Sequence, residues 1–166
     1  MKARVQAEDV HSKQLSWLCI QPMLVSVRGR DMAAKTEIYR QLHEGQQALF
    51  LFYSYHNHTK SLAEFYWFSA YNIIEIKSWH GIKKGMHFFH LAEMATVLDQ
   101  IESLITDKNR VGEEWREVLA TDLDKDPILL QRTEVLYATY QTVAQATIAH
   151  MNEMILQNQE MYLEIV

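Results

Sequence analysis

Residues 126–166 read DPILLQRTEVLYATYQTVAQATIAHMNEMILQNQEMYLEIV, and this stretch decides the fold class. It opens with Asp126-Pro127, a capping residue followed by a proline at the first helical position, and no Gly or Pro follows. We therefore expect a helical segment of about 40 residues, about 60 Å long if straight. A compact domain of this size spans about 30–35 Å. Either the segment kinks or splits within Ala146–Asn152, its least apolar part, or its end projects and pairs with another chain.

Five further segments carry helix signals. The chain has only five Gly and two Pro among 166 residues, and 48% of its residues are hydrophobic, so turn signals are few. Asp31 and Ser61 stand where helix caps are expected. The expected helices span 31–42, 46–55, 61–77, 86–106 and 113–123, with a glycine-containing turn at 79–85. Residues 1–31 form either two helices divided near Pro22 or a helix with a short strand at 23–27.

These patterns predict an all-α protein, a single-domain helical bundle of about five to seven helices with a long C-terminal helix. No linker, internal repeat or low-complexity tract divides the chain, so residues 1–166 are expected to form one domain. Residues 1–31 either join the bundle or form a peripheral N-terminal arm.

Aromatic residues are concentrated in the middle of the chain. About twelve of the Phe, Tyr and Trp residues lie between Phe50 and Phe89, and within 61–77 they cover every face of the expected helix. A helix that is apolar all round is normally the buried centre of a domain; an aromatic ligand cage is the alternative. One stripe of this helix combines acidic and aromatic side chains, namely Glu64, Phe68, Tyr71 and Glu75. That stripe either turns two carboxylates into the core or faces solvent.

Two of the eight histidines open the same pattern, His-x-x-Glu. His90 precedes Glu93 and His150 precedes Glu153, and residues three apart lie on one face of a helix. Each histidine falls within an apolar stripe, so both imidazoles are expected to point inward. One hypothesis is therefore a metal held by these four residues and Glu64. The alternative is that the histidines are structural, because di-iron bundles use the reverse order, Glu-x-x-His.

Charge and cysteine content limit the partners and the compartment. The formal net charge is −5, without the basic stripe typical of nucleic-acid binding. The single cysteine, Cys19, lies in an apolar run and is expected to pack as a small hydrophobic residue. A lone Cys fits a reducing compartment, and neither a membrane span nor a cleavable leader is evident. We expect a cytoplasmic protein with no nucleic-acid or membrane partner.

No phosphate-binding loop or nucleophile elbow is present, so enzymatic activity and cofactor identity stay open. We expect a non-enzymatic binding or regulatory module that acts through protein–protein contacts, with another protein or by self-association. Near the C-terminus, Met and Tyr residues form either an adaptable contact surface or a core stripe; they are Met151, Met154, Met161 and Tyr162. The alternatives to a binding module are the metal-binding bundle and a small-molecule pocket lined by Tyr and Trp.

Overall fold

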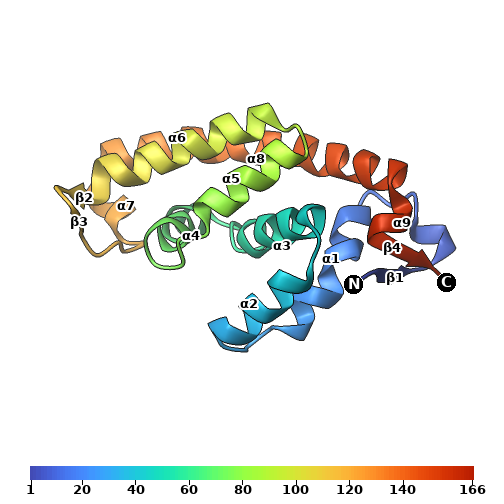
Figure 1. Cartoon of the computed structure of the whole chain (residues 1–166). Helices are drawn as coiled ribbons and strands as arrows, with labels where there is room; N and C mark the ends of the chain where they lie inside the picture. The colour runs from blue at the N-terminus through green and yellow to red at the C-terminus, as the bar shows by residue number, and fades with distance from the viewer.

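The computed structural model describes residues 1–166, and nearly all of its regular structure is helical (Figure 1). In chain order the elements are β1 (Ala3–Val5), η1 (Ala7–Asp9), α1 (Leu15–Ser26), α2 (Met32–Gln41), α3 (Glu44–His56), α4 (Leu62–Ile74), α5 (Trp79–Phe88), α6 (Ala92–Asn109), β2 (Arg110–Val111), β3 (Glu114–Trp115), α7 (Asp122–Lys125), α8 (Pro127–Gln157), α9 (Gln159–Tyr162) and β4 (Leu163–Ile165). Seven of the nine α-helices have ten or more residues, and α7 and α9 have four each. The predicted all-α bundle with a long C-terminal helix is confirmed.

Helix α3 is the centre of the bundle. It packs against α1, α2, α4 and α5, and most of its circumference is buried. The prediction that the aromatic helix at 61–77 is the centre is wrong. Helix α4 packs one face against α6 and α8 and leaves Glu64 and Trp67 on its opposite face exposed. Aromatic content alone does not place a helix in a core, because large rings also occur at the surface.

The stretch 79–85, expected to be a turn, is the first part of helix α5. Its glycines permit close packing on α3. A Cβ atom added at Gly85 would lie 2.8 Å from the Cβ of Ala48, and one added at Gly81 would lie 2.6 Å from Cδ1 of Leu51. At Gly85 glycine is therefore required by the approach of two helices and not by a change of chain direction.

The expected single helix at 86–106 is broken between α5 and α6. His90 has a φ of 56°, and the N–H of Leu91 donates to the carbonyl of Met86 at 2.9 Å. The N–H of His90 also donates to the carbonyl of His87 at 3.1 Å. This pair of bonds around a left-handed residue is the Schellman motif, which ends a helix. Helix α6 begins two residues later with a new direction and a new phase.

Residues 110–121 form a hairpin and a loop where a helix at 113–123 was expected, and that prediction is wrong. Strands β2 and β3 are antiparallel, and Gly112 at the turn has a φ of 63°. The hairpin is closed by the N–H of Arg116, which donates to the carbonyl of Asn109 at 2.9 Å. Only Asp122–Lys125 is helical in this stretch.

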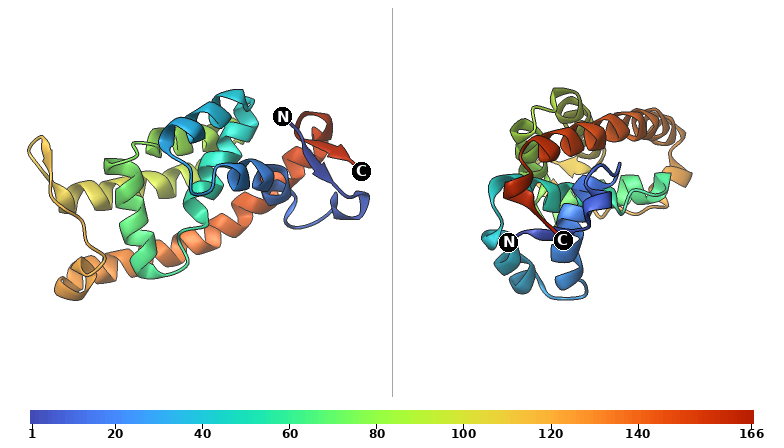
Figure 2. Two further views of the ribbon diagram at one scale, coloured as in Figure 1. Left: turned by 90° about the horizontal axis from the view of Figure 1, so that it is seen from below. Right: turned by 90° about the vertical axis from the view of Figure 1, so that its right-hand side faces the viewer.

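The two ends of the chain meet beside the C-terminal part of α8 (Figure 2). Helix α8 has 31 residues, about 46 Å at 1.5 Å per residue, and it ends at Asn158 and not within 146–152. Strand β4 then pairs in parallel with β1, with Ala3 opposite Leu163 and Val5 opposite Ile165. Helix α1 packs against α3 and α8 and contains Pro22, which does not divide it. Residues 1–31 thus lie against the bundle.

Candidate functional site

Four of the five predicted metal ligands lie at the surface, three of them outside α8. His90 is exposed and occupies the left-handed position after α5, outside the continuous helix in which it was expected. Glu93 is exposed in the first turn of α6. Glu64 is exposed at the start of α4, and its carboxylate accepts the N–H of Lys60 at 3.0 Å. The carboxylate of Glu64 therefore serves the helix terminus.

The other two predicted ligands lie on α8. His150 is half-buried, and its Nε2 is buried without a hydrogen-bond partner, whereas Glu153 is exposed. No group of three or more His, Cys, Asp or Glu side chains in the chain is arranged to hold a metal ion. The five residues are thus not brought together, and all but His150 are exposed.

Two further candidates from the sequence belong mainly to the core. Cys19 is fully buried, and burial raises the pKa of its thiol to about 12, so it is not a thiolate nucleophile. Met151 and Tyr162 are buried and Met154 is half-buried, which leaves Met161 alone exposed. These C-terminal residues are therefore mostly core and not a contact surface.

A network of polar aromatic side chains crosses the core. The hydroxyl groups of Tyr55 and Ser69 lie 2.7 Å apart, and Nδ1 of His56 lies 2.9 Å from the hydroxyl of Tyr140. Burial raises the pKa of both tyrosines and lowers the pKa of His56 to about 4, an effect to which the charge of Lys60 adds. Because these groups satisfy one another inside the core, we assign them a structural role.

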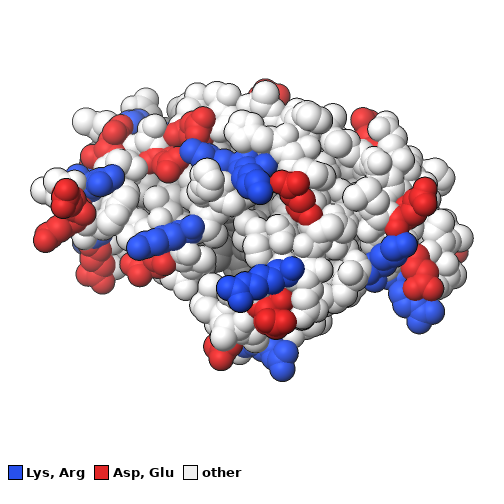
Figure 3. Space-filling model, viewed as in Figure 1, with Lys and Arg blue, Asp and Glu red and all other residues white.

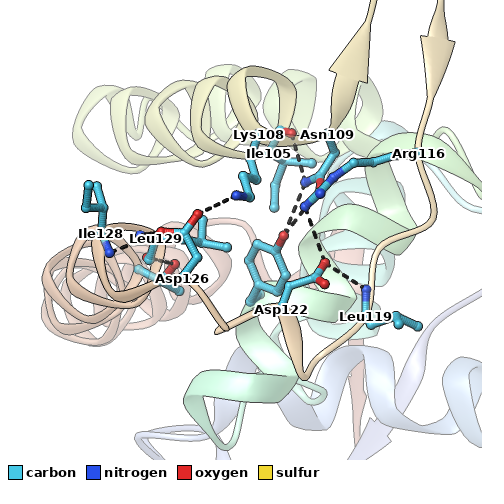
Figure 4. Close-up of polar contacts among 11 residues, drawn as sticks. Ile105, Lys108, Asn109, Arg116, Leu119, Asp122, Asp126, Ile128 and Leu129 are labelled. Carbon is cyan, nitrogen blue, oxygen red and sulfur yellow. Dashed lines mark hydrogen bonds and ion pairs between the residues drawn. The ribbon is translucent and has the colours of Figure 1, made fainter. Parts of the chain in front are cut away.

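Charged residues gather where α6, the hairpin and α7 meet (Figure 4). Nε of Arg116 donates to the buried Asn109 at 2.9 Å, and its guanidinium lies 3.5 Å from the carboxylate of Asp122. Lys108 pairs with Asp126, the residue that caps α8. A groove of about 410 Å³ lies beside them. Arg116, Asp122, Lys108 and Asp126 each have a partner within the chain, so we assign this cluster the role of anchoring the hairpin.

The strongest candidate for a functional surface is the exposed side of α4. We define the aromatic stripe as His58, Trp67, Phe68 and Tyr71. The rings of Trp67 and Tyr71 are stacked, with centroids 5.1 Å apart and planes 11° apart. The ring of His58 stacks on Phe68 at 4.5 Å. Trp67 remains 40% exposed, and Phe68 and Tyr71 are half-buried. Four adjoining rings thus present apolar surface outside the core.

The stripe of Glu64, Phe68, Tyr71 and Glu75 faces solvent and does not turn its two carboxylates into the core. Both glutamates are exposed at the two ends of α4, and the rings lie between them. The sequence pattern therefore located part of this surface but did not place Trp67 on it. Its position next to Glu64 and Tyr71 on the helical wheel is the signal that could have placed it outside.

The rest of the surface carries charges of both signs. On the face of the molecule that Figure 3 shows, acidic and basic side chains are interspersed. No helix of the structure combines the length and the apolar character needed to cross a membrane. Comparison with protein-family models, with curated proteins and with solved structures finds no match to this chain. The functional evidence therefore comes from the surface itself.

Proposed function

We propose that this protein is a non-enzymatic binding module that captures another protein through the aromatic stripe on α4. The observation that carries the proposal is the stacked pair of Trp67 and Tyr71, which stays accessible although the core offers similar rings a buried environment. Tyr and Trp are the residues most enriched at the energetic centres of protein interfaces. Their rigid rings bury a large area at a small cost in conformational entropy.

The surroundings of the stripe indicate the chemistry of the partner. Apolar side chains would cover the rings of Trp67 and Phe68. The exposed carboxylates of Glu64 and Glu75 lie at the rim, where basic side chains of a partner would steer its approach and fix its orientation. We therefore expect a partner surface that is apolar at its centre and basic at its edge.

The first prediction tests this stripe. We expect the double variant Trp67→Ser/Tyr71→Ser to lose its partner, with affinity reduced by about 1,000-fold, because interface residues of this type each contribute about 2 kcal/mol. The measurement is quantitative mass spectrometry of proteins captured from native cell extract, followed by titration of each captured protein with purified wild type and variant.

The control is Leu119→Ser, which removes an apolar side chain of similar exposure, 42%, far from α4 in sequence. The proposal requires at least one protein whose capture depends on Trp67 and Tyr71 and is unaffected by the Leu119 change. Identical sets of captured proteins for wild type and double variant would contradict it, provided that circular dichroism shows both to be folded.

A further inference from the structure

Helix α8 has a second regular face that its own domain does not use. Its inner face buries the residues that complete the core, such as Tyr140, Ala144 and Met151. On the opposite face, exposed residues alternate at spacings of three and four. We define this outer seam as Ile128, Gln131, Val135, Ala138, Thr142, Gln145 and Ala149. Spacings of three and four over several turns are the heptad pattern of helices that pair with another helix.

The composition of the outer seam is unusual for a surface that faces water. From Val135 to Asn152 the helix contains no Asp, Glu, Lys or Arg. Ile128 and Val135 are 73% and 66% exposed, the largest values for apolar residues on this helix. Solvent-facing helices normally carry charges on that side. After Val135 the seam continues with Ala138, Thr142 and Ala149, whose side chains are small enough to let another helix approach closely.

The seam is accessible along its length. In the view from below, α8 lies along the outer edge of the bundle (Figure 2). A groove of about 600 Å³ runs beside it between α6 and α8, and Arg132, Val135 and Thr139 contribute to its wall. A second helix laid on the seam would therefore find room for side chains on the flank that carries Arg132.

We propose that the outer seam pairs with the outer seam of a second copy of this chain, with the two α8 helices antiparallel. The charges that flank the seam carry this assignment. Arg132 and Glu153 occupy equivalent flanking positions three heptads apart, and both are exposed. In an antiparallel pair such positions face each other, so Arg132 of each copy meets Glu153 of the other. A parallel pair would leave both charges without an opposite charge across the interface.

The antiparallel register that joins these charges also matches the seam residues. It places Thr142 opposite Gln145 at the centre, where hydroxyl and amide groups can hydrogen-bond and fix the alignment. Ala138 then lies opposite Ala149 on both sides of the centre, which allows close contact. Arg132 also lies 3.4 Å from Asp107 of its own chain, but both groups are more than half exposed and that bond is weak. This dimer is independent of the proposed function, because the aromatic stripe lies on another helix.

Charge reversal tests the pairing. We expect sedimentation equilibrium over a concentration series to give twice the chain mass of 19.5 kDa for wild type. Arg132→Glu and Glu153→Arg should each weaken dimerisation about tenfold, and the double variant should restore it. Val135→Glu should weaken it about 100-fold, whereas Val111→Glu, at a valine that is 72% exposed on the hairpin, should have no effect. A wild type that stays monomeric, or a double variant no better than the single ones, would overturn the proposal.

Cysteine cross-linking tests the direction and the register. The native Cys19 is buried and gives no background. Ala138→Cys mixed with Ala149→Cys should form a disulfide-linked dimer, because these positions face each other only in the antiparallel register, while each variant alone should cross-link poorly. Cross-linking of each variant with itself would show parallel helices and overturn the assignment. Both positions are exposed, so neither change threatens the fold. If the stripe variants do not alter partner capture, the proposed function fails, but the dimer proposal still stands.

Discussion

Replacing Gly85 by alanine is expected to lower the free energy of unfolding by about 2 kcal/mol, and replacing it by leucine is expected to prevent folding. An added Cβ atom would lie 2.8 Å from the Cβ and 3.0 Å from the Cα of Ala48. Because the Cα of Ala48 belongs to the backbone of the central helix α3, it cannot move without displacing the core around Leu49 and Phe52. A leucine adds three more carbon atoms at the same point, and the resulting strain exceeds what a marginally stable domain tolerates.

Gly81 is the matched control, since it lies one turn earlier on the same helix. Its added Cβ would meet only Cδ1 of Leu51 at 2.6 Å, the far end of a side chain that can change rotamer. Gly81→Ala should therefore change stability by less than about 1 kcal/mol, because better helix propensity offsets the rearrangement. Urea unfolding followed by circular dichroism measures both variants. Equal stability of Gly85→Ala and Gly81→Ala would show that α3 and α5 do not need this close approach.

The beginnings of α2, α4 and α8 were predictable because their signals are local. The side chain of Asp31 accepts the N–H of Ala34 at 2.9 Å, and that of Ser61 accepts the N–H of Glu64 at 3.2 Å. Asp126 accepts two backbone N–H groups at the start of α8. In each case the residue that forms the cap lies within three positions of the group it satisfies, so the sequence alone contains the whole interaction.

Features that depend on distant contacts were not predictable in the same way. The backbone of Gly85 contacts Ala48, a residue of another helix, and nothing near Gly85 in sequence distinguishes a glycine at a helix contact from one in a turn. His90 takes a left-handed conformation although Asn or Gly is the usual residue there. That residue ends α5, so His90 and Glu93 do not lie on one continuous helix as the sequence pattern predicted.

The candidate surface on α4 could be predicted only in part. Periodicity grouped Glu64, Phe68, Tyr71 and Glu75 on one stripe, and the structure keeps them together on the exposed side of α4. Periodicity could not show which side of the helix faces the core, because both sides carry aromatic rings. Packing against α6 and α8 decides that question, and it buries Phe65 while leaving the stripe outside. A surface of this kind becomes visible only after the core is known.

The half-buried imidazole of His56 is expected to make the fold sensitive to mild acid. Its Nδ1 lies 2.9 Å from the hydroxyl of Tyr140, and its ring stacks on Phe52 with centroids 5.2 Å apart and planes 9° apart. Burial lowers its pKa from the model-peptide value of 6.5 to about 4, and the positive charge of Lys60 adds to this shift. Charging the ring would place a cation against an aromatic core without an acidic partner.

The direction of the pH effect follows from the two protonation states. Between pH 6.5 and 4 the unfolded chain binds a proton at His56 that the folded protein does not, so the free energy of unfolding falls as the pH is lowered through this range. At 1.36 kcal/mol per pKa unit the loss from His56 amounts to about 3 kcal/mol, and it ends below about pH 4.

His56→Gln keeps a polar group near Tyr140 but does not titrate, so its stability should change less over the same range. Urea titrations at pH 7, 5.5 and 4 compare it with wild type and with His58→Gln, a change at an exposed histidine. If His56→Gln and wild type lose the same stability between pH 7 and 4, protonation of His56 does not cause the acid sensitivity.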